Sequence, residues 1–257
     1  MGAYHDVRAR LLRGGDEIGG SVPRFTITSL VTEVAYGFTE RASIGARAPF
    51  HWKRFEEPAA AVDLRRSGVG DIELFVTGDL LRSPEPRSSH WRCSATAGVA
   101  LPTGAHEAQP FVGQAAPTPL QLGGGTFDPI LGLSGAFLGW SGWQAEASLS
   151  ARIAVEENDD RYRPPSLMEV AMGGAWRPGA LALALHVEWS HLGRVEVDGA
   201  EVGNTGREAL YLVPAVGYRA RSNLDLGILA RVPVYLRVNQ TQLAETALIA
   251  ARVALSR

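Results

Sequence analysis

Hydrophobic and polar residues alternate with a period of two along most of the chain, which is the period of a β-strand. Residues 142–156 show it most clearly, with Leu149 on the apolar face and Glu146 on the polar face. The pattern predicts about twelve strands, at residues 5–12, 24–38, 41–53, 70–81, 89–101, 126–140, 142–156, 166–177, 181–190, 209–220, 224–237 and 243–256.

The predicted strands are long, at roughly 10–14 residues each, whereas strands of soluble proteins average about 5–6. A tilted strand that crosses a bilayer needs about 9–11 residues. An even number of strands is also typical of bacterial outer-membrane barrels. We therefore predict an all-β fold, an antiparallel up-and-down transmembrane β-barrel that spans residues 1–257 as a single domain in the cell outer membrane.

The predicted connections alternate in length along the chain. Outer-membrane barrels have short periplasmic turns and long outer loops, so both chain ends are expected on the periplasmic side. Whether loop 103–125 folds inward as a plug stays open at this stage. The short connections are 38–41, 139–142, 177–180 and 220–223, with 82–88 of moderate length, and the long ones are 13–23, 54–69, 103–125, 157–165 and 191–208.

All six tryptophans fall near a predicted strand end. Trp91, Trp140, Trp143 and Trp176 lie beside short turns, while Trp52 and Trp189 lie at the opposite ends. Aromatic rings prefer the headgroup level of a bilayer, so this distribution predicts two aromatic girdles. The alternative is a soluble barrel or sandwich of eight to twelve strands with tryptophan at its ends.

Composition narrows the classes of protein. The 257 residues are 46% hydrophobic and 20% charged, with a formal net charge of −2, which excludes a disordered chain and gives no reason to expect a nucleic-acid partner. Cys93 is the only cysteine, so a disulfide within the chain and a cysteine-based metal site are excluded. No secretory signal is visible, and we expect export to depend on a segment absent from this sequence.

The polar faces of the predicted strands are expected to line the lumen. Their charges are of both signs, which indicates either a path that selects solutes or a salt-bridged interior that holds a narrow barrel together. The candidate lumen-lining residues are Arg47, Glu73, Asp79, Arg92, Glu146, Arg152, His186, Glu188, Asp225 and Arg231.

Three finer expectations concern individual side chains. Arg92 is expected at a height similar to that of Glu73, with Asp79 as its closer partner. His186 and Glu188 share one face and are expected to form a satisfied lumen pair, because no third residue is placed to complete a metal site. In 224–237, Leu236 is expected to face lipid.

The chain lacks a Gly-x-Ser-x-Gly elbow, a phosphate-binding loop and a His-Glu-x-x-His motif. We therefore expect no enzyme activity, no catalytic residue and no cofactor.

Several stretches resemble the outer-membrane proteins labelled "MetA-pathway of phenol degradation", commonly described as transporters. The resemblance implies a barrel that passes or binds small, often hydrophobic molecules, and it implies no catalytic residues. The matching stretches are Val69-Gly70-Asp71-Ile72-Glu73-Leu74, Val99-Ala100-Leu101-Pro102-Thr103-Gly104, Leu122-Gly123-Gly124-Gly125-Thr126-Phe127-Asp128-Pro129, Val232-Pro233-Val234-Tyr235 and Val238-Asn239-Gln240-Thr241-Gln242-Leu243.

The sequence thus predicts a channel or transporter for small, hydrophobic or aromatic solutes. The alternative is a structural barrel that serves as scaffold or sheath for a periplasmic partner and conducts nothing. Expected partners are outer-membrane lipid and lipopolysaccharide, a small-molecule solute, and a periplasmic protein or further copies of the chain.

Overall fold

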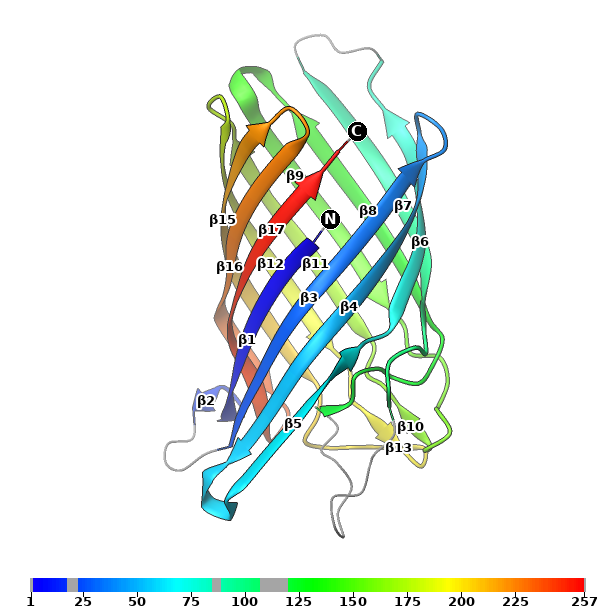
Figure 1. Cartoon of the computed structure of the whole chain (residues 1–257), viewed down its shortest axis with the longest axis vertical. Helices are drawn as coiled ribbons and strands as arrows, with labels where there is room; N and C mark the ends of the chain where they lie inside the picture. The colour runs from blue at the N-terminus through cyan, green and yellow to red at the C-terminus, as the bar shows by residue number, and fades with distance from the viewer. Residues whose placement is uncertain (1, 18–22, 85–88, 107–119, 257) are drawn as a thin grey trace.

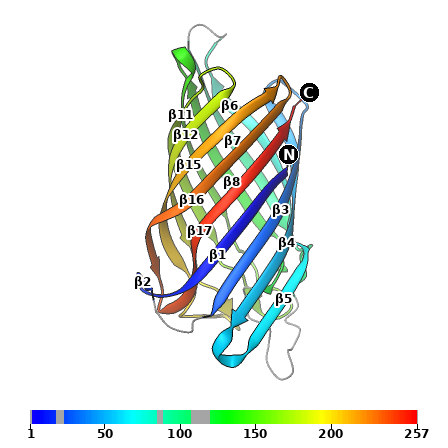
Figure 2. The ribbon, with the colours of Figure 1, turned by 60° about the vertical axis from the view of Figure 1, so that its left-hand side comes forward.

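A computed structural model describes residues 2–17, 23–84, 89–106 and 120–256, and twelve of its strands close into a barrel (Figure 1). Each strand is antiparallel to its neighbours, and the last strand pairs with the first, which completes the ring (Figure 2). The barrel strands are β1 (Gly2–Arg13), β3 (Arg24–Gly37), β4 (Ala42–Glu57), β6 (Ile72–Arg82), β7 (His90–Leu101), β8 (Asp128–Leu138), β9 (Trp143–Arg152), β11 (Leu167–Trp176), β12 (Leu181–Leu192), β15 (Arg207–Arg221), β16 (Leu224–Val238) and β17 (Thr241–Leu255). The predicted barrel is confirmed.

The two ends of the barrel differ, as the connection lengths predict. The short turns, such as the one between β3 and β4, lie at the upper end in Figure 1, and the C-terminal end of β17 points the same way. The long connections lie at the lower end and carry the short strands. These are β2 (Asp16–Glu17), β5 (Val62–Val69), β10 (Tyr162–Arg163), β13 (Glu196–Val197) and β14 (Ala200–Glu201), with 3-10 turns η1 (Pro58–Ala60) and, at the other end, η3 (Trp140–Gly142). Residues 107–119 of the predicted loop 103–125 lie outside the described residues.

The outer wall of the barrel is apolar and accessible. Leu149 is 37% exposed and Ile228 is 63% exposed, although both lie within paired barrel strands. Within the described ranges, no helix is long and apolar enough to cross a membrane. At the short-turn end the rings of Trp143 and Trp176 stack with centroids 6.0 Å apart. Aromatic rings at this level are typical of the headgroup region.

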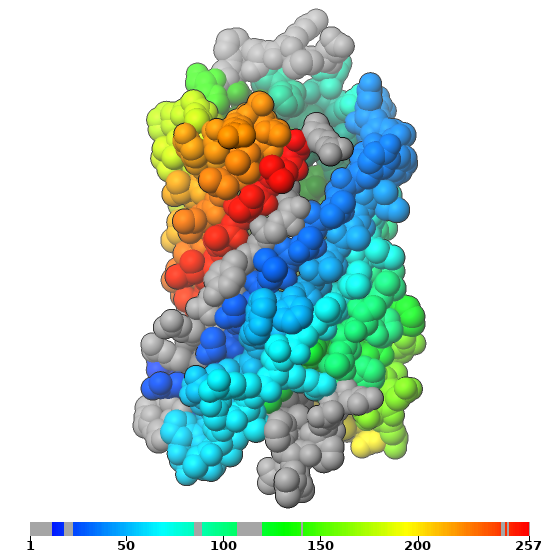
Figure 3. Space-filling model, viewed as in Figure 1, coloured from blue at the N-terminus to red at the C-terminus, as the bar shows by residue number. Residues whose placement is uncertain are grey.

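Along one edge, the long strand β4 pairs with two different strands. Its first part, Ala42–Arg47, pairs with β6, and its outer part, Phe50–Glu57, pairs with β5. The hairpin of β4 and β5 extends beyond the wall at the lower end (Figure 3). The sequence predicts a loop over residues 54–69, and this prediction is wrong. Asp63 pairs with both Arg54 and Arg65, and this compensation allows the charged residues to form a hairpin. Hydrogen bonds from Arg54 and Arg65 hold the pKa of Asp63 below its usual value.

A register shift corrects the predicted faces of β16. The shift lies between Leu210 and Tyr211 on β15, opposite Tyr235 and Pro233. An extra residue in one strand reverses which side chains point inward beyond it. Leu236 consequently packs against buried Tyr211 inside the barrel instead of facing lipid.

Adjacent residues of β9 provide a test of the two faces. Leu149→Arg places a charge on the apolar outer wall and should lower the free energy of unfolding by about 2–4 kcal/mol, the cost of arginine near the bilayer midplane. Ser150→Arg, on the opposite face, should cost much less. Urea unfolding in lipid vesicles measures both, and equal costs would contradict the assignment of the faces.

Candidate functional site

The interior of the barrel is crossed by groups of ion pairs. In the first group, the Arg47 guanidinium lies between Glu33 and Glu73, at 3.0 Å and 2.8 Å, and so ties β4 to β3 and β6. The same guanidinium carbon lies 5.6 Å from the centre of the Phe75 ring. This arrangement neutralises one arginine on the wall of β3 to β6.

Glycines make room for the aromatic ring beside this group. Gly45 and Gly98 pair with Phe75 from the strands on either side. A Cβ on Gly45 would collide with the Phe75 ring, and one on Gly98 would collide with the backbone of β6 and with the Cβ of Phe75. The glycine at position 45 therefore leaves room for the Phe75 ring beside β4.

The second group centres on Arg231 and joins five strands. Its guanidinium contacts Glu188, lies 3.0 Å from Glu169, and covers the ring of buried Tyr211 at 3.9 Å. Glu245 on β17 lies 3.8 Å from Arg231 and 3.3 Å from Arg207 on β15. Each of the two arginines thereby contacts at least one carboxylate inside the barrel.

A third contact pairs Glu146 on β9 with His186 on β12, at 2.5 Å. Gly173 on β11 lies between them in the register of the sheet. A Cβ on Gly173 would collide with the His186 ring and with the backbone of β12. Only glycine leaves the space in which the two side chains meet across a strand.

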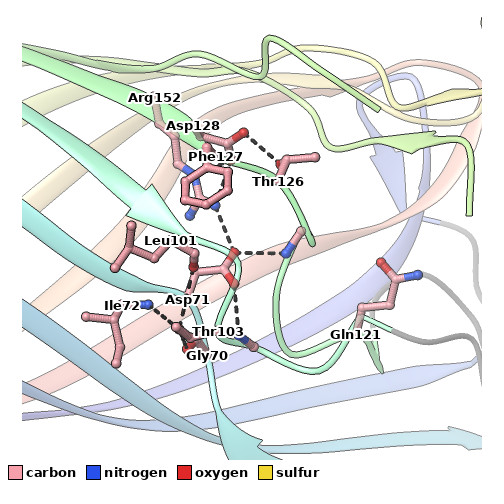
Figure 4. A network of polar contacts seen from close by, with 12 residues as sticks. Gly70, Asp71, Ile72, Leu101, Thr103, Gln121, Thr126, Phe127, Asp128 and Arg152 are labelled. Atoms are coloured by element: carbon pink, nitrogen blue, oxygen red, sulfur yellow. Dashed lines mark hydrogen bonds and ion pairs between the residues drawn. The ribbon is translucent and has the colours of Figure 1, made fainter. Parts of the chain in front are cut away.

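At the end of the barrel that carries the long connections, here named the outer end, Arg152 bridges two buried carboxylates (Figure 4). Its guanidinium lies 3.0 Å from Asp71, before β6, and 2.8 Å from Asp128, at the start of β8. The two aspartate side chains are only 5% and 2% exposed. Removing the arginine would therefore leave two neighbouring buried charges without compensation.

The same carboxylates fix the loop segment 120–126. Asp71 accepts hydrogen bonds from the backbone N–H groups of Gly104 and Gly124, at 3.1 Å and 2.8 Å. The Thr126 hydroxyl donates to Asp128 at 2.8 Å. We call Asp71, Asp128 and Arg152 with these donors the outer clasp. It brings together the Gly-Asp, Leu-Pro-Thr-Gly and glycine-rich stretches that carry the family resemblance.

Close packing at the outer clasp explains its glycines and buried apolar residues. A Cβ on Gly123 would collide with the Asp71 carboxylate. Leu120 and Leu122 are buried, and the Lys53 ammonium on β4 donates to the carbonyl of Gln121. Segment 120–126 is thus held against the inner side of the wall at the outer end of the barrel.

Toward the short-turn end the interior is hollow. A cavity of about 990 Å³ is lined by Arg41, Asp79, Arg82 and His90 among others. A second, of about 340 Å³, follows the wall from β7 to β15, and Arg92 lines both. A third, of about 450 Å³, is bounded in part by small residues, including Ala175, Ala182, Ala184, Ala215, Gly217 and Gly227.

Two predicted pairings are wrong. Asp79 accepts a hydrogen bond from Ser94, at 2.7 Å, instead of pairing with Arg92. A register shift between Asp79 and Leu81 places Arg92 opposite Arg82, which moves it away from the expected partner. Among the described residues no ion-pair partner reaches Arg92. His186 and Glu188 do not pair with each other either, because each reaches a residue on another strand.

The remaining candidates are placed by the contacts above, except Asp225. It pairs with Arg219 at 3.2 Å near the short-turn end, where both side chains are about half exposed. The sequence did not indicate the carboxylates that pair with the candidate arginines, namely Asp128, Glu33, Glu169 and Glu245. Asp128 does belong to one of the stretches that resemble the family. Within the described ranges, no group of three or more His, Cys, Asp or Glu residues is placed to hold a metal ion.

Comparison with known proteins agrees with this architecture. Residues 13–253 match the family described as "Putative MetA-pathway of phenol degradation". The chain belongs to this family. No curated protein matches it.

Two solved structures resemble this family member over nearly its whole length. The COG4313 outer membrane channel from Pseudomonas putida F1 is 15% identical, with a TM-score of 0.67, over 98% of this chain and 94% of that one. The beta domain of the Bordetella autotransporter Brka is 9% identical, with a TM-score of 0.55, over 100% of this chain and 98% of that one. At these identities the likeness shows the fold, that of an outer-membrane β-barrel, and it agrees with the predicted location.

The outer clasp can be tested with two arginines that differ in burial. Arg152→Met should lower the free energy of unfolding by about 3–5 kcal/mol, because two buried carboxylates lose their partner. Arg219→Met breaks an exposed pair and should cost less than about 1 kcal/mol. Urea unfolding in lipid vesicles gives both values, and similar losses would show that the outer clasp is no more than a surface contact.

Two glycines test the crossing of His186 over β11. Gly173→Ala should lower the free energy of unfolding by about 1–3 kcal/mol, since the added methyl overlaps the ring and the backbone. Gly135→Ala is the matched control on β8, because a Cβ there meets nothing within 4 Å. The same unfolding measurement applies, and a neutral Gly173→Ala would contradict the close contact.

Proposed function

We propose that this protein is an outer-membrane channel that passes small solutes, hydrophobic and aromatic ones among them, through its lumen. The observation that carries the proposal is the hollow interior at the short-turn end, whose cavities are lined by alanine and glycine as well as by charged side chains. Small side chains leave space inside a barrel of twelve strands, where larger ones would fill it.

The paired charges support the same function. Arg47 and Arg231 each contact more than one carboxylate, so the cations on these parts of the wall are already compensated within the protein. Where charges of the wall are compensated in this way, a solute meets less fixed charge than isolated arginines would present. The family description, which names phenol degradation, supports solutes of aromatic size.

The alternative is a barrel that acts as a scaffold for a periplasmic partner and conducts nothing. The ion-pair groups favour it in one respect, since they join strands across the interior and would stiffen a closed barrel. A measurement of ion conduction distinguishes the channel from the scaffold, because only the channel needs a continuous aqueous path.

Recording of ion current across a planar lipid bilayer tests the channel. The protein should conduct, and phenol at millimolar concentration should interrupt the current. A barrel that inserts and stays silent would favour the scaffold, whereas current without interruption by phenol would leave a channel that does not hold aromatic solutes.

Two adjacent residues of β12 show whether the current runs through the lumen. Ala184 lines a cavity, whereas Leu185 is on the outer wall and half exposed. Ala184→Trp should reduce the single-channel conductance by at least half because the indole occupies the cavity. Leu185→Trp should leave the conductance unchanged. Equal conductance in the two variants would contradict a path along this wall.

A further inference from the structure

One row of the sheet places a cation and an acid on either side of an unfilled part of the lumen. In the register, Arg92 on β7 pairs with Ala136 on β8, which pairs with Glu146 on β9. The row continues through Gly173 to His186 on β12. These residues therefore lie side by side at one level of the inner wall.

A small residue separates Glu146 from its neighbour on each side of this row, Gly173 from His186 and Ala136 from Arg92, and the two spaces differ. His186 crosses Gly173 and reaches Glu146 at 2.5 Å. On the other side, Ala136 separates Glu146 from Arg92, and two strand spacings put their backbones about 10 Å apart. No ion pair between them is formed, and the cavity of about 340 Å³ lies between their side chains.

Each side of this gap offers a different polar group. Arg92 has guanidinium N–H donors that no carboxylate among the described residues occupies, and a planar guanidinium binds a carboxylate through two parallel hydrogen bonds. Glu146 uses Oε1 for His186 and Oε2 for Gln144, yet its side chain is still 40% exposed. Each carboxylate oxygen can accept a further hydrogen bond.

The surface between the two groups suits a flat molecule. Ala136 lines the cavity there and carries only a methyl group, and the neighbouring Gly135 and Ala147 alternate to the outer face, so no larger side chain stands between Arg92 and Glu146. Ser134 and Ser148 add hydroxyl groups at the edge. A ligand whose acidic and hydroxyl groups stand at opposite ends of a ring could reach both sides, whereas an α-amino acid holds its charges too close together to span the gap.

We propose that this row is a binding subsite for small aromatic hydroxy acids, with the carboxylate on Arg92 and the hydroxyl donating to Glu146. The subsite deepens the proposed function and rests on it, since a solute reaches the row by way of the lumen. Arg92 also lines the larger cavity at the short-turn end, so it lies where the two spaces meet.

Calorimetric titration of the full chain in detergent micelles tests the subsite, with 4-hydroxybenzoate, benzoate and phenol as probes. The protein should bind 4-hydroxybenzoate at least about tenfold more tightly than phenol, the usual effect of a charge-assisted hydrogen bond. It should also prefer 4-hydroxybenzoate to benzoate, which lacks the hydroxyl.

Variants test which residue binds the carboxylate of the ligand and which binds its hydroxyl group. Arg92→Gln should weaken binding of 4-hydroxybenzoate and benzoate about tenfold and leave phenol unchanged. Arg92→Lys, which keeps the charge without the planar fork, should lose less. Glu146→Gln should reduce the preference for 4-hydroxybenzoate over benzoate. Arg65→Gln makes the same change of charge on the outer hairpin and should bind as the unaltered protein does.

Equal affinity for the three probes would overturn the subsite, and so would an Arg92→Gln variant that migrates as a folded barrel and still binds 4-hydroxybenzoate normally. The bilayer recording keeps this result apart from the proposed function. A conducting protein without dependence on Arg92 refutes the subsite alone. A silent barrel that binds through Arg92 supports the subsite and refutes the channel.

Discussion

A charged side chain buried inside a membrane-spanning barrel is costly unless an opposite charge or hydrogen bonds compensate it, and this constraint shapes the interior of the protein. Arg152 shows the constraint most directly, because it compensates two almost fully buried aspartates at once. Since Asp71 also holds the backbone N–H groups of two loop glycines, the position of segment 120–126 depends on the same arginine. One set of contacts thus sets both the local stability and the shape of the outer end.

The pairing of charges determines where small residues must stand. Side chains that meet across an intervening strand need that strand to present glycine, as Gly173 does between Glu146 and His186. Where no such crossing occurs, small residues leave space instead, and Ala136 and Ala184 line cavities. Parts of the lumen are therefore filled by ion pairs, and other parts are lined by small residues that leave space for a solute.

Much of this fold could be predicted from the sequence, because alternation and connection length are local properties. Residues 142–156 illustrate both the success and its limit: the faces agree, but the strand ends at Arg152, where the side chain turns toward the outer clasp. That Arg92 and Asp79 do not pair could not be predicted, since a register shift beside Asp79 changes which residues lie opposite one another. Likewise Arg231 on β16 and Glu169 on β11 are separated in the sheet by two strands, β15 and β12, and no spacing in the sequence indicates their contact.

The motifs that carry the family resemblance are explained by contacts in the structure rather than by their spacing in the sequence. Gly70-Asp71, Thr103-Gly104 and Gly123-Gly124 are separate in the sequence, and nothing in their spacing indicates that they meet. In the structure the Asp71 carboxylate accepts hydrogen bonds from Gly104 and Gly124, and beside it the Thr103 hydroxyl donates to the Gly70 carbonyl (Figure 4). Their recurrence as a set is accounted for by packing and charge compensation at the outer clasp.

The central claim is that the inner face of the strands lines an aqueous path. Single cysteines introduced in turn at positions 182 to 185 of β12, in a Cys93→Ser background, test it directly by reaction with a water-soluble thiol reagent during current recording. Modification at 182 and 184 should reduce the current, and modification at 183 and 185 should not. Equal effects at all four positions, or none at 182 and 184, would contradict the account.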